Sequence, residues 1–264
     1  MIHSIRAELV KLTRRRFVLI TLLVTIVYAI GGTAIGVITA EPGAAGPPGP
    51  DSLLSISALA DAGGGTAVFA QMAAFGAAFL LAVFIGTVAG EFSRGTFRTM
   101  LLQQPGRVRV LVGKMVAVVG FAAVLAIFAE VIAWITARLL APGQGIDTSA
   151  WTTTDAVLAA ADDYGRLLVF IVGWSLLATM IGVLARSVPL GVGVGLVWAG
   201  PIENIVGESW SPGERFFPGL LLRAIINPDS STVSSGRVLL TLSIYGAIAI
   251  AVAGVALSRR DVTS

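Results

Sequence analysis

The chain has 264 residues, of which 56% are hydrophobic and 12% charged, and its mean hydropathy is +0.89. A soluble domain carries about 25% charged residues, so this composition excludes a soluble protein and indicates an integral membrane protein. The net charge of +3 does not indicate nucleic-acid binding, because the basic residues flank apolar stretches and form no single face. The chain has no cysteine and one histidine, His3, which argues against disulfides and against thiolate or histidine metal sites.

Residues 1–16 predict an amphipathic helix that lies in the membrane interface. Four apolar residues recur at helical spacing and share one face, namely Ile2, Ile5, Leu9 and Leu12. The charged residues lie mostly on the rest of the helix: Arg6, Glu8, Lys11, Arg14, Arg15 and Arg16. Such a helix turns its cationic residues toward anionic headgroups. The alternative is that these residues flank the first span without forming a helix.

Six apolar stretches predict transmembrane helices, because a bilayer core about 30 Å thick requires roughly 20 apolar residues in a helix. The expected spans are residues 17–38, 66–89, 115–137, 167–185, 188–206 and 238–257. The fifth is the weakest, because it contains Pro201, Glu203 and Asn204. The first is longer than the apolar core of about 7–15 residues in a signal peptide, so we expect it to be a retained anchor.

The distribution of basic residues predicts that both termini are cytoplasmic. With six spans, thirteen of the 18 Lys and Arg residues fall on the side of the N-terminus and five on the other side. All but Lys11 and Lys114 of these are arginine, which favours a GC-rich bacterial source. We therefore expect an all-α, multi-pass protein of the bacterial cytoplasmic membrane, folded as a single transmembrane domain over residues 1–264.

Residues 207–236, before the last span, contain a short apolar stretch at 220–226 between Pro218 and Pro228. Seven residues cannot cross a bilayer, but they can enter it and return where protein satisfies the backbone. We expect either a re-entrant hairpin on the outer side or a surface loop with an interfacial aromatic anchor.

The cytoplasmic segment 90–114 combines basic charge with a short helical pattern. Its basic residues are Arg94, Arg98, Arg107, Arg109 and Lys114. One helical face is shared by Phe97, Met100, Leu101 and Gln104. The pair Gly95-Thr96 offers a flexible start with a cap, and Pro105 ends the helix.

This segment resembles the membrane permeases of type 2 ATP-binding-cassette exporters. In that family an acidic residue ends the second span and is followed by Gly-Thr, a leucine-containing stretch, Pro, Arg, and a Gly-Lys that opens the third span. The matching residues here are Glu91, Gly95, Thr96, Leu101, Leu102, Pro105, Arg107, Gly113 and Lys114. The motif covers about 25 residues, while the similar arrangement of interfacial helix, six spans and hairpin covers nearly the whole chain.

The resemblance implies that segment 90–114 is a coupling helix, which docks on a separate ATPase subunit and relays its nucleotide-driven closure. It implies docking contacts by Phe97, Arg98, Thr99 and Leu101, and a contact of Glu91 with the basic N-terminal helix. The other coupling candidates are Arg94, Gly95, Thr96, Pro105, Arg107 and Lys114. The alternative is that Arg94, Arg98, Arg107 and Arg109 are topology signals only.

The chain itself is not expected to be an enzyme or to bind a cofactor. A phosphate-binding loop requires G-x-x-x-x-G-K-[ST], and at Gly113-Lys114 the first Gly is replaced by Val108 and the Ser/Thr by Met115. ATP and magnesium are therefore expected on the partner ATPase.

Two ionisable residues fall within the predicted spans, Glu130 and Glu203. Each costs about 2.5–3.5 kcal/mol at the bilayer centre, so each requires a reason. Both are candidates for the substrate path, where they could line an exit or bind a cationic head. The structural alternatives are pairing with Arg138 or Arg223 and contact with interfacial water.

The sequence favours the permease of an ATP-driven exporter for a lipophilic or amphipathic substrate, with two copies forming a homodimer or heterodimer in the lipid bilayer. A secondary transporter would require intramembrane ionisable relays or inverted repeats. A membrane-embedded enzyme would require paired catalytic residues or clustered ligands, which the spans lack. A scaffold or immunity subunit that binds a ligand without moving it is a further alternative.

Overall fold

The computed structural model describes residues 2–42, 54–96, 106–210, 212–228 and 231–259. Within these ranges the chain is helical, and the only extended pairing is an isolated bridge between Glu41 and Ser55. Five helices are long and apolar enough to cross a membrane, or six if one bent pair is a single span. The prediction of an all-α, multi-pass membrane protein is therefore confirmed for the described residues.

The four uninterrupted membrane-length helices extend beyond the predicted spans. They are α2 (Arg15–Ile38), α7 (Arg107–Leu140), α8 (Thr154–Ala185) and α12 (Ser235–Arg259). At a rise of about 1.5 Å per residue, the 34 residues of α7 span about 51 Å. This length exceeds the hydrocarbon core of about 30 Å, so α7 is longer than one crossing requires.

The predicted span 66–89 is bent by 60° between α4 (Gly64–Phe75) and α5 (Ala77–Ser93). The bend lies at Gly76, whose amide donates to the carbonyl of Ala73 rather than to that of Met72. The Tyr28 hydroxyl of α2 donates to the Met72 carbonyl instead. A Cβ at position 76 would lie 2.9 Å from this hydroxyl, so glycine allows α2 to cap the break.

The predicted span 188–206 consists of α9 (Val188–Val197), a π-helical turn (Trp198–Ile202) and α10 (Glu203–Ser209). Pro201 has no amide hydrogen and cannot continue an α-helical ladder, which explains the wider turn. The side-chain amide of Asn204 donates to the carbonyls of Ala199 and Gly200 at 3.3 and 2.8 Å. Two of the three residues that weakened this prediction, Pro201 and Asn204, thus form the interruption together.

The stretch 220–226 lies in α11 (Pro218–Ile226), which packs against α8 and α12. Its side chains Leu221 and Leu222 are fully buried. Between α10 and α11 the chain makes a short 3-10 turn (Gly213–Arg215). A helix–turn–helix unit therefore precedes α12.

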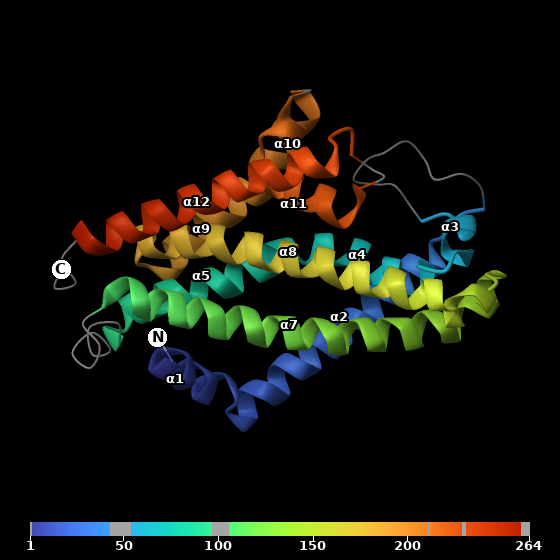
Figure 1. Cartoon of the computed structure of the whole chain (residues 1–264), viewed down its shortest axis with the longest axis horizontal. Helices are drawn as coiled ribbons and strands as arrows, with labels where there is room; N and C mark the ends of the chain where they lie inside the picture. Colours follow the sequence, from blue (N-terminus) through green and yellow to red (C-terminus); the bar gives the residue numbers. More distant parts are fainter. Residues whose placement is uncertain (1, 43–53, 97–105, 211, 229–230, 260–264) are drawn as a thin grey trace.

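One end of the bundle gathers α1 (Ile2–Leu12), the end of α5, the start of α7 and the end of α12 (Figure 1). The Arg107 guanidinium donates to the Leu257 carbonyl at 2.9 Å, and the Ser93 hydroxyl donates to the Arg186 carbonyl at 3.2 Å. The opposite end holds α3 (Ile56–Ala60) and two 3-10 turns (Ala141–Gln144 and Ser149–Thr152). We refer to the first end as the α1 end.

Candidate functional site

Helix α1 buries a polar face as well as part of its apolar one. Ser4, Glu8 and Leu12 follow one another at four-residue spacing and are buried, mainly against α7. By contrast, Ile2 is 77% and Leu9 39% exposed. The apolar face predicted to lie in the membrane interface therefore has two environments, because Leu12 is buried in the core while Ile2 and Leu9 are exposed on the surface.

Four charged side chains from α1, α5 and α7 form a closed ion-pair cluster at the α1 end. The Lys114 ammonium lies 2.9 Å from Glu91 Oε1 and 3.1 Å from Glu8 Oε2. The Lys11 ammonium lies 2.6 Å from Glu8 Oε1 and 3.1 Å from Glu91 Oε1. Each cation thus bridges both carboxylates, and we call these four residues the charge cluster.

The charge cluster is neutral in sum and largely buried. Glu8, Glu91 and Lys114 are each 4–5% exposed, whereas the Lys11 side chain is 45% exposed. Burial opposes ionisation of Glu8, but the hydrogen bond from Lys11 and the charge of Lys114 outweigh it and lower the pKa of Glu8. Burial likewise opposes ionisation of Lys11, but the hydrogen bond to Glu8 and the charge of Glu91 raise the pKa of Lys11. Both groups therefore stay charged over a wide pH range.

The charge cluster joins the two flanks of the predicted coupling segment. Glu91 lies in the last turn of α5, at the start of segment 90–114, and Lys114 lies about two turns into α7, at the end of the segment. The expected contact of Glu91 with the N-terminal helix is present, through Lys11. The sequence did not indicate that Glu8 and Lys114 also take part, since Glu8 looked like one more polar residue of an interfacial helix.

The other described coupling candidates shape the ends of α5 and α7. Gly95 has φ 68°, a left-handed conformation that favours glycine, and its amide bonds the Phe92 carbonyl at 3.1 Å. Gly95 therefore follows the end of α5 and separates it from Thr96, the last described residue before the gap. Arg94 caps α5 through its amide, and the Thr96 hydroxyl donates to the Glu91 carbonyl at 3.3 Å. Five other candidates lie outside the described residues: Phe97, Arg98, Thr99, Leu101 and Pro105.

Glu203 is 1% exposed and lies against the start of α11. Its carboxylate accepts from the Trp198 indole N–H at 2.6 Å and from the backbone amides of Gly219 and Leu220. The positive end of a helix stabilises a carboxylate in this position. A Cβ at Gly219 would lie 2.0 Å from Glu203 Oε2, so the close approach requires glycine. Glu203 thus fastens α10 to α11.

Glu130 is 9% exposed, and its Oε1 has no hydrogen-bond partner among the described residues. Its carboxyl interacts electrostatically with that of Asp163 on α8. Asp163 accepts from the Thr66 hydroxyl of α4 at 2.7 Å. Glu130 therefore belongs to a polar group formed by α4, α7 and α8.

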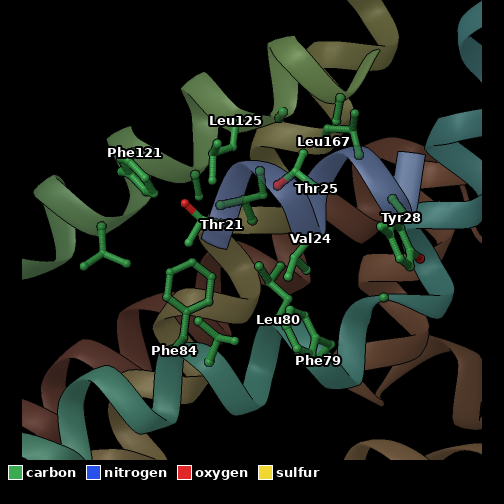
Figure 2. A pocket seen from close by; sticks show the side chains of 18 of the residues that line it. Thr21, Val24, Thr25, Tyr28, Phe79, Leu80, Phe84, Phe121, Leu125 and Leu167 are labelled. Atoms are coloured by element: carbon green, nitrogen blue, oxygen red, sulfur yellow. The ribbon is translucent and has the colours of Figure 1, made fainter. Parts of the chain in front are cut away.

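An apolar cavity of about 400 Å³ lies between α2, α4, α5, α7 and α8 (Figure 2). Figure 2 shows Thr21 and Val24 of α2, Phe79 and Leu80 of α5, and Phe121 of α7 around it. Of its polar lining groups, the hydroxyls of Thr21, Tyr28 and Thr87 donate to backbone carbonyls. The lining therefore presents mainly hydrocarbon to an occupant.

The cavity opens to the outside of the bundle between α2 and α5. Helix α2 packs mainly on α7 and α4. On the open side the lining residues are exposed, with Ile20 and Phe79 each at 63% and Val24 and Val83 each at 43%. A cavity formed by five helices could not be read from any one of the apolar stretches.

Comparison of the sequence with protein-family models found no match, and comparison with curated proteins found none either.

Proposed function

We propose that this chain is the permease subunit of an ATP-driven exporter. In this proposal α4 and α5 form one bent span, so that the chain crosses the bacterial cytoplasmic membrane six times with the α1 end in the cytoplasm. Two copies form the transport path, and separate ATPase subunits bind ATP and magnesium. The predicted re-entrant hairpin of the outer side, within residues 207–236, contains α11.

The charge cluster carries this proposal. A motor that moves the segment between Glu91 and Lys114 must move at least one of these two side chains. Both are paired with α1, and α1 continues into α2 within three residues. Buried ion pairs tolerate little separation, because an uncompensated buried charge costs about 3–5 kcal/mol. The cluster therefore makes α1, α5 and α7 move as one body, which is what relay of a docking motion requires.

The apolar cavity supports the substrate class. Ligand cavities measure about 300–1,000 Å³ and are lined mostly by apolar side chains with few polar groups. A cavity of about 400 Å³ between the spans suits a lipophilic or amphipathic molecule and offers no ligands for an inorganic ion. Entry between α2 and α5 would come from the membrane rather than from water.

The docking partner can be identified with a crosslinker on a single cysteine, because the natural chain has none. The test variant is Gln103→Cys, in the coupling segment but not among the proposed docking residues. The matched control is Leu139→Cys, which is 76% exposed near the other end of α7. We expect mass spectrometry to recover a cytoplasmic protein with a Walker loop from the first variant only. Recovery of only further copies of this chain from both variants would contradict the proposal.

Coupling can be tested separately with Arg98→Ala. We expect normal membrane insertion but at least tenfold lower substrate-stimulated ATPase activity in the assembled transporter. The control is Arg166→Ala, which removes an arginine of α8, outside the coupling segment, that pairs with Asp162 at 2.6 Å. Unchanged coupling in Arg98→Ala would show that the segment only sets topology.

Proton-coupled secondary transport is the second candidate, and the group of Glu130 and Asp163 favours it. Two interacting carboxyls between spans, one without a hydrogen-bond partner among the described residues, are the kind of group that relays protons in transporters. Dissipating the proton gradient while ATP is present should then abolish transport, and Glu130→Gln should have the same effect. Transport that persists in both cases would leave only the ATP-driven proposal.

A further inference from the structure

The apolar cavity extends from the α1 end along about half the length of α2. Its wall along α2 begins at Phe17 and ends at Tyr28, with Leu12 of α1 as a further contact. Eleven residues of helix rise about 17 Å, and the hydrocarbon core is about 30 Å thick. The cavity is therefore about as deep as one leaflet, and its length suits one acyl chain.

Three arginines directly precede the part of α2 that lines this cavity. Arg14 precedes α2, and Arg15 and Arg16 are its first residues, directly before the lining residue Phe17. All three side chains are exposed. None of the three forms an ion pair with a residue in the described ranges, in contrast to Lys11 close by. Their charges are thus available to an anion at the membrane surface.

We infer that the cavity binds an anionic membrane lipid, with one acyl chain between α2 and α5 and the headgroup phosphate at Arg14, Arg15 and Arg16. An acyl chain is as well solvated by the bilayer as by an apolar cavity. The acyl chain therefore positions the lipid in the cavity, and the arginines select for an anionic headgroup. One such charge near the membrane surface is worth about a fivefold preference for anionic lipid.

This lipid site requires no ATPase and does not depend on the chain being a permease. A lipid between α2 and α5 would lie against Tyr28, and so beside the bend at Gly76. It would also lie beside Leu12, one turn after Glu8 of the charge cluster. Its headgroup would hold the junction of α1 and α2 at the membrane surface.

The test uses the full chain in vesicles with a photoactivatable phosphatidylglycerol that carries a diazirine on its acyl chain. The comparison probe is phosphatidylcholine with the same chain and diazirine. We expect at least tenfold more labelling of the cavity walls on α2 and α5 by the anionic probe, located by mass spectrometry. Equal labelling by both probes would overturn the inference.

Two kinds of variant separate the contribution of the lipid headgroup from that of its acyl chain. Replacing Arg14, Arg15 and Arg16 by Gln should lower cavity labelling by the anionic probe to the level of the zwitterionic one, while replacing them by Lys should preserve it. Because arginines also set topology, each variant is first checked for the accessibility of a cysteine placed at its N-terminus. Ala122→Phe fills the cavity with the arginines intact and should abolish labelling there.

The matched control is Ile244→Phe, on a surface of α12 that is 51% exposed and outside the cavity. It should leave cavity labelling unchanged. Unchanged labelling in Ala122→Phe would overturn the inference. So would crosslinks from the walls of α2 and α5 to a second copy of the chain in place of lipid, since a dimer contact would then fill the opening.

Discussion

Lys114 holds the charge cluster together, and its replacement by Met is the most direct test of that role. The ammonium contacts both carboxylates, at 2.9 and 3.1 Å, from a side chain that is 7% exposed. Its removal leaves Glu8 and Glu91 to share Lys11. Losing one partner of a buried pair costs about 3–5 kcal/mol, and because Lys11 still neutralises one charge we expect the lower value. About 3 kcal/mol shifts the docking of α1 on the order of 100-fold.

The assay follows the distance between nitroxide labels at Arg6→Cys on α1 and Val112→Cys on α7, in a chain that otherwise lacks cysteine. We expect a narrow distribution for the parent and a broad one for Lys114→Met. The double variant Lys114→Met/Glu91→Gln restores neutrality, leaving the pair of Glu8 and Lys11, and should be narrow again. A distribution that Lys114→Met leaves unchanged, or that stays broad in the double variant, would refute the argument that charge balance docks α1.

The same labels should show that α1 is docked only within a range of pH. The pKa of Glu8 is lowered from its ordinary 4.5, so its contribution to the docking of α1 is complete above about that pH and is lost as pH falls through the lowered value. The pKa of Lys11 is raised from 10.5, so its contribution to the docking of α1 is complete below that pH and is lost as pH rises through the raised value. A distance distribution that stays constant at both extremes of pH would contradict this. Separately, Gly219→Ala should lower the unfolding temperature because its Cβ would meet Glu203 Oε2 at 2.0 Å, whereas the control Gly236→Ala, with nothing within 4 Å, should not. Equal unfolding temperatures for the two alanine variants would show that the carboxylate is not fixed at α11.

The membrane-crossing helices could be predicted because their signal is local and strong. The apolar stretches coincide with helices, although α7 and α8 begin well before the predicted spans 115–137 and 167–185. Pro201 and Asn204 lie at the interruption before α10. The bend at Gly76 could not be predicted, since hydropathy is insensitive to a break inside an apolar run. Nothing in the sequence distinguishes Gly76 from the other 30 of the chain's 31 glycines.

The candidate site was predicted in part. The motif placed Glu91 opposite the N-terminal helix, and the contact with Lys11 is present. The partnership of Glu8 with Lys114 joins residues 106 positions apart, which no helical pattern reveals. Glu8 did carry a signal, as the one acidic side chain in the first sixteen residues, four positions before the buried Leu12. The roles of the residues between 97 and 105 remain predictions from the family resemblance.

The hydroxyl of Tyr28 gives the cavity and the bend at Gly76 a common boundary. The side chain is part of the cavity wall, and the same hydroxyl completes the hydrogen bonding of the broken span at Met72. An occupant that displaced this ring would leave a carbonyl without its donor in a medium that offers no water. Thermodynamic linkage then requires the converse, that straightening or deepening of the bend alters the affinity of the cavity for its occupant. Occupancy of the cavity and the angle of the bend at Gly76 are in this sense coupled through the Tyr28 hydroxyl.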